Sequence, residues 1–164
     1  MKTIKKIMVA CDFSEYSKQA LEYASYLAEK LKADLIITHI INQRDIDAIQ
    51  KVAGYTATIS LEEFLKNQFK DRSHRIDKLI EEAGVEQLPV KKIIKTGIPF
   101  VQLINAVKEE GVDLVVMGPK GRSNLINILF GTTAEKMFRH CPVQLLSVRT
   151  DKHARVQINP ESSI

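Results

Sequence analysis

Short apolar runs rich in β-branched residues alternate along this chain with longer segments of helical period, and this alternation most constrains the fold. The apolar runs occupy residues 4–10, 35–41, 114–117 and 142–148, and residues 90–95 form a further strand pattern in which lysines alternate with apolar pairs or single residues. The second run is apolar at nearly every position, which is typical of a strand covered on both faces. The alternation favours a parallel sheet with right-handed crossovers. We therefore predict a single-domain α/β fold with a five-stranded parallel sheet, in the order 3-2-1-4-5, and helices on both faces.

The segments between these runs predict helices that have recognisable ends. They are residues 17–31, residues 61–82, the stretch from Pro99 to Gly111, and the stretch that opens with Ala134. Gly84 and Gly111 follow two of them, and glycine is a common helix stop. Residues 42–58 show no clean period and contain Gly54. We expect a mobile connection there, and a short helical piece within it is the alternative. The third strand is expected to be shorter and more exposed than the others.

A glycine pattern follows the fourth apolar run. Gly118 and Gly121 are separated by two residues, and nine residues later Gly131 precedes Thr132 and Thr133. Glycine lets backbone N–H groups approach an anion closely. A helix start adds unpaired N–H donors and positive partial charge. This spacing is neither a P-loop nor a dinucleotide-binding G-x-G-x-x-G motif. The pattern therefore predicts a different phosphate site.

Two features noticed separately fall on one crevice in the predicted sheet. Asp12 follows the first strand and Gly118 follows the fourth. These strands are neighbours in the order 3-2-1-4-5, and their helices lie on opposite faces. Ligands bind at such points, outside the carboxyl ends of the strands. The sequence thus places an acidic side chain and a glycine turn at the same site.

The arrangement resembles the universal stress protein family, in the branch that binds ATP through a G-x2-G-x9-G-[S/T] motif. The stretch from Met117 to Thr133 carries that motif. The opening strand ending in Asp12-Phe-Ser14, the pair His39-Ile40, the turn Gly97-Ile-Pro99 and the pair Cys141-Pro142 match other parts of the family pattern. The resemblance extends from about residue 4 to residue 148. It implies a Rossmann-like nucleotide-binding domain over residues 1–149, followed by a loose polar tail over 150–164.

The resemblance also implies roles for individual residues. Asp12 would contact the ribose or the base, the backbone near Ile40 would contact the edge of the adenine, and Gly118 would pack under the ribose. The nucleotide-binding residues implied in full are Ala10, Cys11, Asp12, Ile40, Met117, Gly118, Gly121, Arg122, Ser123, Gly131, Thr132 and Thr133. The cofactor would be ATP, with Mg²⁺ or Mn²⁺ bridging the phosphates. No catalytic residue and no protein metal ligand is expected.

A homodimer is expected through the fifth strand. Residues Val143 to Val148 are largely apolar and lie at the sheet edge in the predicted order. An apolar edge strand invites pairing with another chain unless it is covered. A two-fold antiparallel contact would cover it symmetrically. The resemblance implies the same strand as the contact, although Gln144 stands where the family usually has a valine-like residue.

Simpler interpretations of the same residues stay open. The glycines would also suit a tight turn, with Thr132 or Thr133 as an ordinary helix cap. Asp12 would also cap the first helix or accept backbone N–H bonds in an Asx-turn, and its two oxygens allow both kinds of role. Lys120 and Arg122 would also be solvated loop charges, although a guanidinium matches phosphate oxygens well.

The remaining chemistry-bearing residues predict no catalytic or metal site. The four histidines have no metal-ligand spacing, and Cys11 ends a buried strand, which favours a core role over a nucleophilic one. Cys11 and Cys141 form no C-x-x-C motif, which suits a reduced, cytoplasmic protein. We expect no signal peptide and no membrane span. The 24 basic and 20 acidic residues are dispersed, so no nucleic-acid partner is expected.

The sequence therefore predicts a cytoplasmic ATP-binding stress-response protein in which nucleotide occupancy sets conformation or partner choice. A slow ATP hydrolase or phosphotransferase is the enzymatic alternative, but no carboxylate base is evident beside the expected phosphates. A dimeric interaction module without nucleotide is a third possibility, and the intact glycines argue against it. A flavodoxin-like electron carrier would share the layered fold, but fold alone does not fix function.

Overall fold

A five-stranded parallel sheet organises the chain in the computed structural model, which describes residues 3–53, 60–121 and 130–149. The strands are β1 (Lys6–Cys11), β2 (Asp34–Asn42), β3 (Val90–Gly97), β4 (Leu114–Met117) and β5 (Gln144–Ser147). Their order is β3-β2-β1-β4-β5, and each neighbouring pair is parallel. The predicted fold class and strand order are confirmed.

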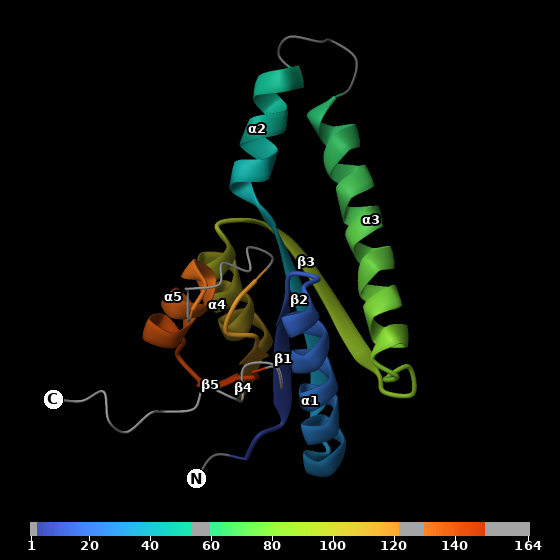
Figure 1. Cartoon of the computed structure of the whole chain (residues 1–164), viewed down its shortest axis with the longest axis vertical. Helices are drawn as coiled ribbons and strands as arrows, with labels where there is room; N and C mark the ends of the chain where they lie inside the picture. The colour runs from blue at the N-terminus through green and yellow to red at the C-terminus, as the bar shows by residue number, and fades with distance from the viewer. Residues whose placement is uncertain (1–2, 54–59, 122–129, 150–164) are drawn as a thin grey trace, which may run out of the picture.

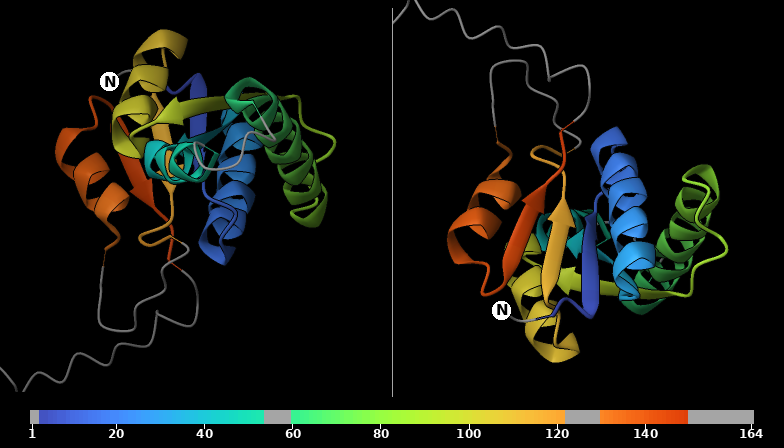
Figure 2. Two further views of the ribbon diagram at one scale, coloured as in Figure 1. Left: turned by 90° about the horizontal axis from the view of Figure 1, so that it is seen from above. Right: turned by 90° about the horizontal axis from the view of Figure 1, so that it is seen from below.

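Helices cover both faces of this sheet (Figures 1 and 2). The helices are α1 (Glu15–Leu31), α2 (Gln43–Ala53), α3 (Leu61–Glu82), α4 (Pro99–Glu110) and α5 (Thr132–His140). Helices α1 and α3 contribute to the apolar cluster on one face, and α4 and α5 contribute to the cluster on the other. The covering of both faces explains why the inner strands are apolar at successive positions.

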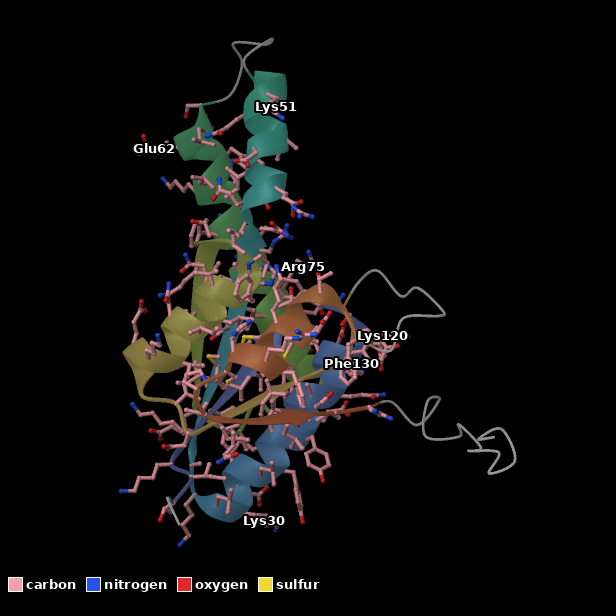
Figure 3. All side chains as sticks on the ribbon, turned by 90° about the vertical axis from the view of Figure 1, so that its left-hand side faces the viewer. Lys30, Lys51, Glu62, Arg75, Lys120 and Phe130 are labelled. Carbon is pink, nitrogen blue, oxygen red and sulfur yellow. The ribbon has the colours of Figure 1, made fainter. Side chains whose placement is uncertain are left out.

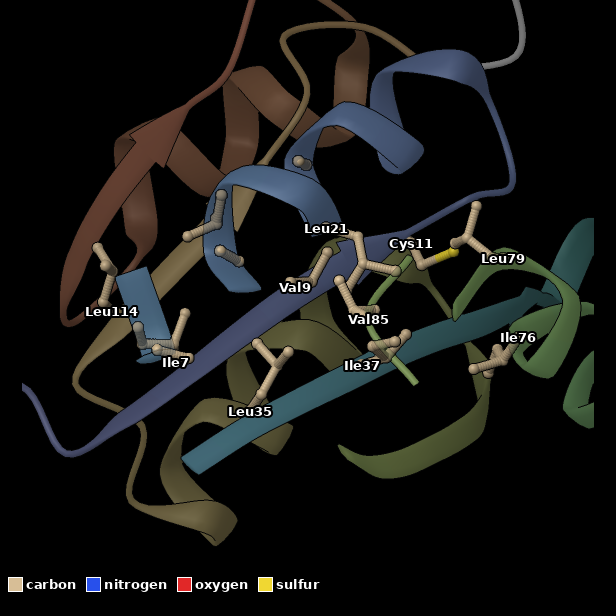
Figure 4. Packing of buried hydrophobic residues seen from close by; sticks show 14 residues of the cluster. Ile7, Val9, Cys11, Leu21, Leu35, Ile37, Ile76, Leu79, Val85 and Leu114 are labelled. Atoms are coloured by element: carbon tan, nitrogen blue, oxygen red, sulfur yellow. The ribbon is translucent and has the colours of Figure 1, made fainter. Parts of the chain in front are cut away.

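The core consists of two apolar layers that successive strand residues supply in turn. Ile7 and Val9 of β1 point to the α1 side, and Met8 between them points to the α4 side. All three are fully buried. Figure 4 shows the first layer, where Val9 and Ile37 pack near Leu21 of α1. This layering holds the carboxyl ends of β1 and β4 side by side.

Local signals in the sequence fix several helix ends. Ser14 caps α1, and its Oγ accepts a hydrogen bond from the N–H of Ser17 at 3.4 Å. Ser60 caps α3 in the same way through the N–H of Glu63, at 3.1 Å. Gly111 ends α4 with φ +64°, a conformation that glycine adopts without a steric penalty. The predicted stop at Gly111 is therefore confirmed.

Three expectations about elements need correction. Residues 43–53 form helix α2 of 11 residues, where the sequence predicted a mobile connection with room for a short helical piece. Strand β3 spans eight residues, so it is longer than β4 and not the short strand expected. Strand β5 is limited to Gln144–Ser147, inside the longer run that was predicted. The tail 150–164 and the segment around Gly54 lie outside the described residues.

Helices α2 and α3 stand side by side and extend away from the sheet (Figures 1 and 3). Figure 3 labels Lys51 and Glu62 near the far end of this pair. Ile46, buried to 4% exposure, anchors the near end of α2. Helix α3 has 22 residues, but within the described ranges no helix is both long and apolar enough to cross a membrane.

Candidate functional site

A cavity of about 480 Å³ opens at the carboxyl ends of β1, β2 and β4. Its volume lies within the range of small-molecule sites, and its place is where parallel sheets bind ligands. The lining comes from segments far apart in the sequence. It consists of Ala10, Cys11, Asp12, Ser17, Thr38, His39, Ile40, Asn42, Asp45, Pro99, Leu103, Met117, Gly118, Lys120, Gly121, Gly131, Thr132, Thr133 and Ala134.

The two glycine turns meet at one side of this cavity. The N–H of Gly131 donates to the carbonyl of Pro119 at 2.9 Å, which ties the start of α5 to the turn after β4. A Cβ at Gly118 would overlap the Cβ of Tyr16, and a Cβ at Gly121 would overlap the carboxylate of Asp12. Both positions therefore require glycine for close packing within the fold.

Gly131 differs from the other two glycines. A Cβ there would meet nothing closer than 3.6 Å, and the nearest atoms are the backbone N of Gly121 and the Cα of Lys120. The fold thus leaves room at Gly131 that a side chain could enter. Because that room lies beside a backbone N–H, it suits a ligand atom that accepts a hydrogen bond.

Helix α5 begins at the same place. Gly131 is its N-cap and offers no side-chain cap, and the first three residues of the helix, Thr132, Thr133 and Ala134, all line the cavity. The first N–H groups of a helix have no acceptor within the helix and carry positive partial charge. This side of the cavity therefore favours an anion.

Asp12 stabilises the loop between β1 and α1 through one carboxylate oxygen, which accepts three hydrogen bonds. The N–H of Ser14 donates to Asp12 Oδ1 at 3.0 Å, and the hydroxyls of Ser14 and Ser17 donate to the same oxygen at 2.6 Å each. The Asx-turn considered from the sequence is therefore present, while the cap of α1 comes from Ser14. The other oxygen, Oδ2, faces Gly121.

The opposite side of the cavity is apolar. We call it the apolar slot, and it consists of Ala10, Thr38, Ile40, Pro99, Leu103 and Met117. Ile40, Leu103 and Met117 are each buried to 8% exposure or less. Thr38 is the single polar side chain of the slot, and it is fully buried. One cavity thus joins a surface suited to an anion with a surface suited to a flat apolar group.

Cys11 is the last residue of β1, and His39 lies beside it on β2. Burial raises the pKa of the Cys11 thiol to about 12, so it stays protonated and weakly nucleophilic at neutral pH. This agrees with the core role predicted for it. His39 Nδ1 lies 2.9 Å from the carbonyl oxygen of Cys11, and since a carbonyl only accepts, Nδ1 carries the proton. Within the described residues no group of three acidic, histidine or cysteine side chains is placed to hold a metal ion.

Phe13, in the loop beside Asp12, has φ +64°, which is uncommon for a residue with a bulky side chain. Its ring contacts the ring of His39 in a tilted arrangement, with the centroids 4.4 Å apart and the planes at 43°. The guanidinium of Arg75, on α3, lies 4.1 Å from the centre of the same ring. Contacts from two elements therefore hold the loop that carries Asp12.

Comparison with known proteins identifies the family of this chain. Residues 3–149 match the model of the universal stress protein family. The chain belongs to this family. It is 32% identical to the universal stress protein MJ0577 of Methanocaldococcus jannaschii, over 88% of this chain and 94% of that relative. The solved structure of MJ0577 superposes with a TM-score of 0.74 at 26% identity, covering 92% of this chain and 99% of that one.

Two other structures of the family share the fold. A universal stress protein in complex with cAMP has a TM-score of 0.64 at 19% identity, covering 90% of this chain and 98% of that one. The universal stress protein of Archaeoglobus fulgidus in complex with dAMP has a TM-score of 0.58 at 14% identity, covering 90% of this chain and all of that one. At these identities the likeness establishes the fold.

The universal stress protein fold brings the residues singled out from the sequence together. Ten of them line the one cavity: Ala10, Cys11, Asp12, Ile40, Met117, Gly118, Gly121, Gly131, Thr132 and Thr133. They come from β1, β2, the turn after β4 and the start of α5. Arg122 and Ser123, also named from the sequence, lie outside the described residues.

Other lining residues were not predicted as part of the site. Pro99 and Leu103 face the cavity from the first turns of α4, four residues apart on one helix face. The Gly97-Ile-Pro99 turn marked the start of α4 but gave no sign of that helix's orientation. Asp45 reaches the cavity from α2, a helix that the sequence did not predict. Asn42, Thr38 and Ser17 carried no motif that would have marked them.

Proposed function

We propose that this universal stress protein binds adenine nucleotides, with ATP as its ligand, in the cavity at the carboxyl ends of β1, β2 and β4. The carrying observation is that one cavity of about 480 Å³ has two chemically different sides. Backbone donors near Gly121 and Gly131 suit phosphate oxygens, and the apolar slot suits a purine ring. The cAMP and dAMP complexes of two relatives support adenine nucleotides as the ligand class.

Individual residues have separate tasks in this proposal. The phosphates lie over Gly121 and at the start of α5, where Thr132 and Thr133 add hydroxyl donors. Arg122 and Ser123 belong to the same phosphate side by their place in the motif. Asp12 contacts the ribose or the base, and the backbone at Ile40 contacts the edge of the adenine. Gly118 and Met117 form the floor between the two sides.

A divalent cation, Mg²⁺ or Mn²⁺, accompanies the phosphates in this proposal. The cavity lining offers two carboxylates, Asp12 and Asp45, and Asp12 already accepts three hydrogen bonds through Oδ1. The ion is therefore held mainly by phosphate oxygens and water, as Mg²⁺ commonly is in nucleotide sites. When bound, it neutralises phosphate charge and supports the geometry of the triphosphate.

We favour regulation by nucleotide occupancy over rapid catalysis. Phosphoryl transfer requires a group that orients the attacking water or substrate beside the γ-phosphate. Near Gly121, the described lining residues offer glycines, threonines, Lys120 and the carboxylate of Asp12, and one oxygen of that carboxylate already accepts three hydrogen bonds that close its loop. Hydrolysis, where it occurs, is therefore slow. The bound nucleotide instead sets the conformation or the partner choice of a stress-response protein acting in the cytoplasm.

A homodimer through β5 completes the proposal. This strand lies at the sheet edge, and Leu145 and Leu146 are each half-buried in the single chain. Antiparallel pairing of two copies would cover the edge symmetrically. Light scattering is expected to give about 37 kDa, which is twice 18.5 kDa. A mass of one chain at micromolar concentration, with and without ATP, would remove the dimer from the proposal.

Calorimetry with ATP, ADP, AMP and adenosine on the wild type and Gly131→Ala tests the binding site. The fold has room for the added Cβ, but that carbon lies 3.6 Å from the backbone N of Gly121 and crowds the phosphate approach. We expect the affinity for ATP to fall about tenfold, corresponding to about 1.4 kcal/mol, and the affinity for adenosine to stay unchanged.

The control for this experiment is thermal stability. Exchanging glycine for alanine at this helix cap is expected to change the free energy of unfolding by less than about 1 kcal/mol. Equal wild-type affinity for ATP and adenosine would contradict the phosphate side of the site. Failure of the wild type to bind any adenine nucleotide with Mg²⁺ present would show that the glycine pattern serves only as a structural turn.

A further inference from the structure

Thr38 is the one feature of the apolar slot that packing alone does not explain. It lies in the middle of β2, paired with Ala10 of β1 on one side and with Ile93 of β3 on the other. Its exposed fraction is 0%. Within the described residues, its Oγ1 is one of the buried side-chain atoms that have no hydrogen-bond partner.

An unpaired hydroxyl in such a place is unfavourable for the empty protein. A hydroxyl that loses water on burial and gains no partner costs stability, and valine has almost the same shape without that cost. Valine also suits a central strand at least as well as threonine. The position therefore carries a polar atom that the fold of the ligand-free protein does not use.

The surroundings of Thr38 connect this hydroxyl with the cavity. Thr38 lines the cavity together with Ala10, Ile40, Leu103 and Met117, whose side chains offer no hydrogen-bonding nitrogen or oxygen. The other polar lining residues of β2 and α2 are His39, Asn42 and Asp45. The His39 ring contacts Phe13, while Asn42 is the last residue of β2 and Asp45 lies in the first turn of α2. A ligand that fills the slot would thus find one side-chain hydroxyl there.

We propose that Thr38 is a base-contacting residue whose hydroxyl forms a hydrogen bond with a ring nitrogen or exocyclic amine of the purine in the apolar slot. A hydroxyl both donates and accepts, so it can pair with either kind of group. Rotation of Thr38 about χ1, or a small shift of a neighbouring apolar side chain, exposes Oγ1 to the ring. This inference rests on the proposed function and assigns one residue to the recognition of the base.

Thr38→Val tests the proposal because it removes the hydroxyl and keeps the shape. Calorimetry is expected to show about a fivefold loss of affinity for ATP and for adenosine alike, since both carry the base. Gly131→Ala is expected to weaken ATP alone. The ligand-free Thr38→Val protein is expected to melt at the same temperature as the wild type or higher. Lower affinity combined with undiminished stability would not follow from a merely structural role.

Two further variants control the comparison. Thr38→Ser keeps the hydroxyl and is expected to retain most of the affinity lost in Thr38→Val. Ser147 Oγ is also buried without a partner among the described residues, but Ser147 does not line the cavity. Ser147→Ala therefore makes the same chemical deletion elsewhere and is expected to leave both affinities unchanged.

The possible outcomes separate this inference from the proposed function. If the wild type binds ATP and adenosine and Thr38→Val binds both equally well, the role of Thr38 is refuted and the nucleotide site stands. If Thr38→Val weakens ATP but leaves adenosine unchanged, the hydroxyl does not contact the base and the inference also fails. If the wild type binds no adenine nucleotide, the proposed function is refuted, and this inference, which depends on it, is refuted as well.

Discussion

The two ends of the sheet each carry a hollow of similar size, but the residues around them differ in kind. The hollow at the carboxyl ends has a volume of about 480 Å³ and is lined by glycines, a helix start and an apolar slot. The hollow at the amino ends has a volume of about 450 Å³ and is lined by Lys6, Asp34, Pro89, Lys91, Glu110 and apolar neighbours. Volume therefore does not distinguish them.

Three charged residues of the amino-end hollow, Lys6, Lys91 and Glu110, are paired with one another. Lys6 Nζ donates to the carbonyl of Glu110 at 2.9 Å, and Lys91 Nζ lies 2.6 Å from Glu110 Oε2. Beside the hollow, Asp113 Oδ2 accepts the N–H groups of Lys5 and Lys6. At the carboxyl end, by contrast, the helix start and Thr38 offer polar atoms that a ligand can use. The comparison teaches that unused hydrogen-bonding capacity, more than empty volume, marks the candidate site.

The largest effect is expected from Gly118→Ala at the carboxyl end. The new Cβ would overlap the Cβ of Tyr16, a buried residue of α1. A Cβ atom is fixed by the backbone, so no side-chain rotation of Tyr16 can relieve this overlap. Overpacking of this kind costs about 1–3 kcal/mol. Thermal or urea unfolding of Gly118→Ala and Gly131→Ala measures the contrast, since only the first substitution meets an overlap. Equal stability of the two variants would contradict the close packing described for the first glycine turn.

A matched pair of aspartates separates structural from ligand-binding roles at the two ends. Asp12→Ala removes the acceptor of three hydrogen bonds, and Asp113→Ala removes the acceptor of two backbone N–H groups. Each loss is expected to lower the free energy of unfolding by about 1–3 kcal/mol. Only Asp12→Ala is expected to weaken ATP binding as well.

Urea unfolding and calorimetry with ATP on Asp12→Ala and Asp113→Ala test whether the two aspartates differ in this way. If Asp12→Ala lowers stability but binds ATP like the wild type, Asp12 serves only to close its loop. If Asp113→Ala weakens ATP binding, the two ends of the sheet are coupled and the contrast between them no longer holds.

The contrast between the ends also explains how much of the structure could be predicted. The strands and their parallel arrangement followed from the apolar runs, because both faces of the sheet are covered and the core residues of β1 and β2 therefore follow one another closely in the sequence. The order 3-2-1-4-5 was assumed for such a sheet and is confirmed by the structure. Helix α2 was predicted only as a short helical piece within a mobile connection, although Ile46 and Ile49 follow a helical spacing. Ile46 is its one buried side chain among the described residues, so the helix adds little to the core that guided the prediction.

The candidate site shows the same division. The glycines were predictable because close backbone packing and a phosphate approach both demand glycine at fixed spacing, which appears directly in the sequence. Pro99, Leu103 and Thr38 were not, since their facing the cavity depends on how α4 packs against β2. An unpaired hydroxyl at Thr38 has no signature in the sequence at all. Only the three-dimensional arrangement distinguishes it from an ordinary strand threonine.

A pH experiment contrasts the two cysteines, which lie at opposite ends of the sheet. Burial raises the pKa of Cys11 to about 12 from an ordinary value of 9.0, and it raises the pKa of the half-buried Cys141 as well. The folded protein therefore keeps the Cys11 proton where the unfolded chain releases it. The associated stability is complete below pH 9 and is lost as the pH rises from 9 toward 12, by about 1.4 kcal/mol at pH 10.

Urea unfolding at pH 8 and pH 10 isolates the contribution of the Cys11 thiol to stability when the wild type, Cys11→Ala and Cys141→Ala are compared. The wild type is expected to lose more stability than Cys11→Ala between the two pH values, because the variant has no thiol at that position. Cys141→Ala is expected to behave more like the wild type. The same pH dependence in all three proteins would place the titrating group elsewhere.

The smallest effect is expected from Lys91→Ala, which opens the ion pair at the amino-end hollow. The side chain of Lys91 is 58% exposed and that of Glu110 is 21% exposed, so water and salt screen the 2.6 Å contact between them. Exposed ion pairs contribute about 0–1 kcal/mol. A double-mutant cycle of Lys91→Ala and Glu110→Ala, measured by urea unfolding in low and high salt, is expected to give a coupling energy in that range that shrinks with salt. ATP affinity is expected to stay at its wild-type value in each variant, because Lys91 and Glu110 do not line the cavity at the carboxyl ends. A change in ATP affinity would show that the amino-end hollow contributes to binding and that the two ends differ less than their chemistry indicates.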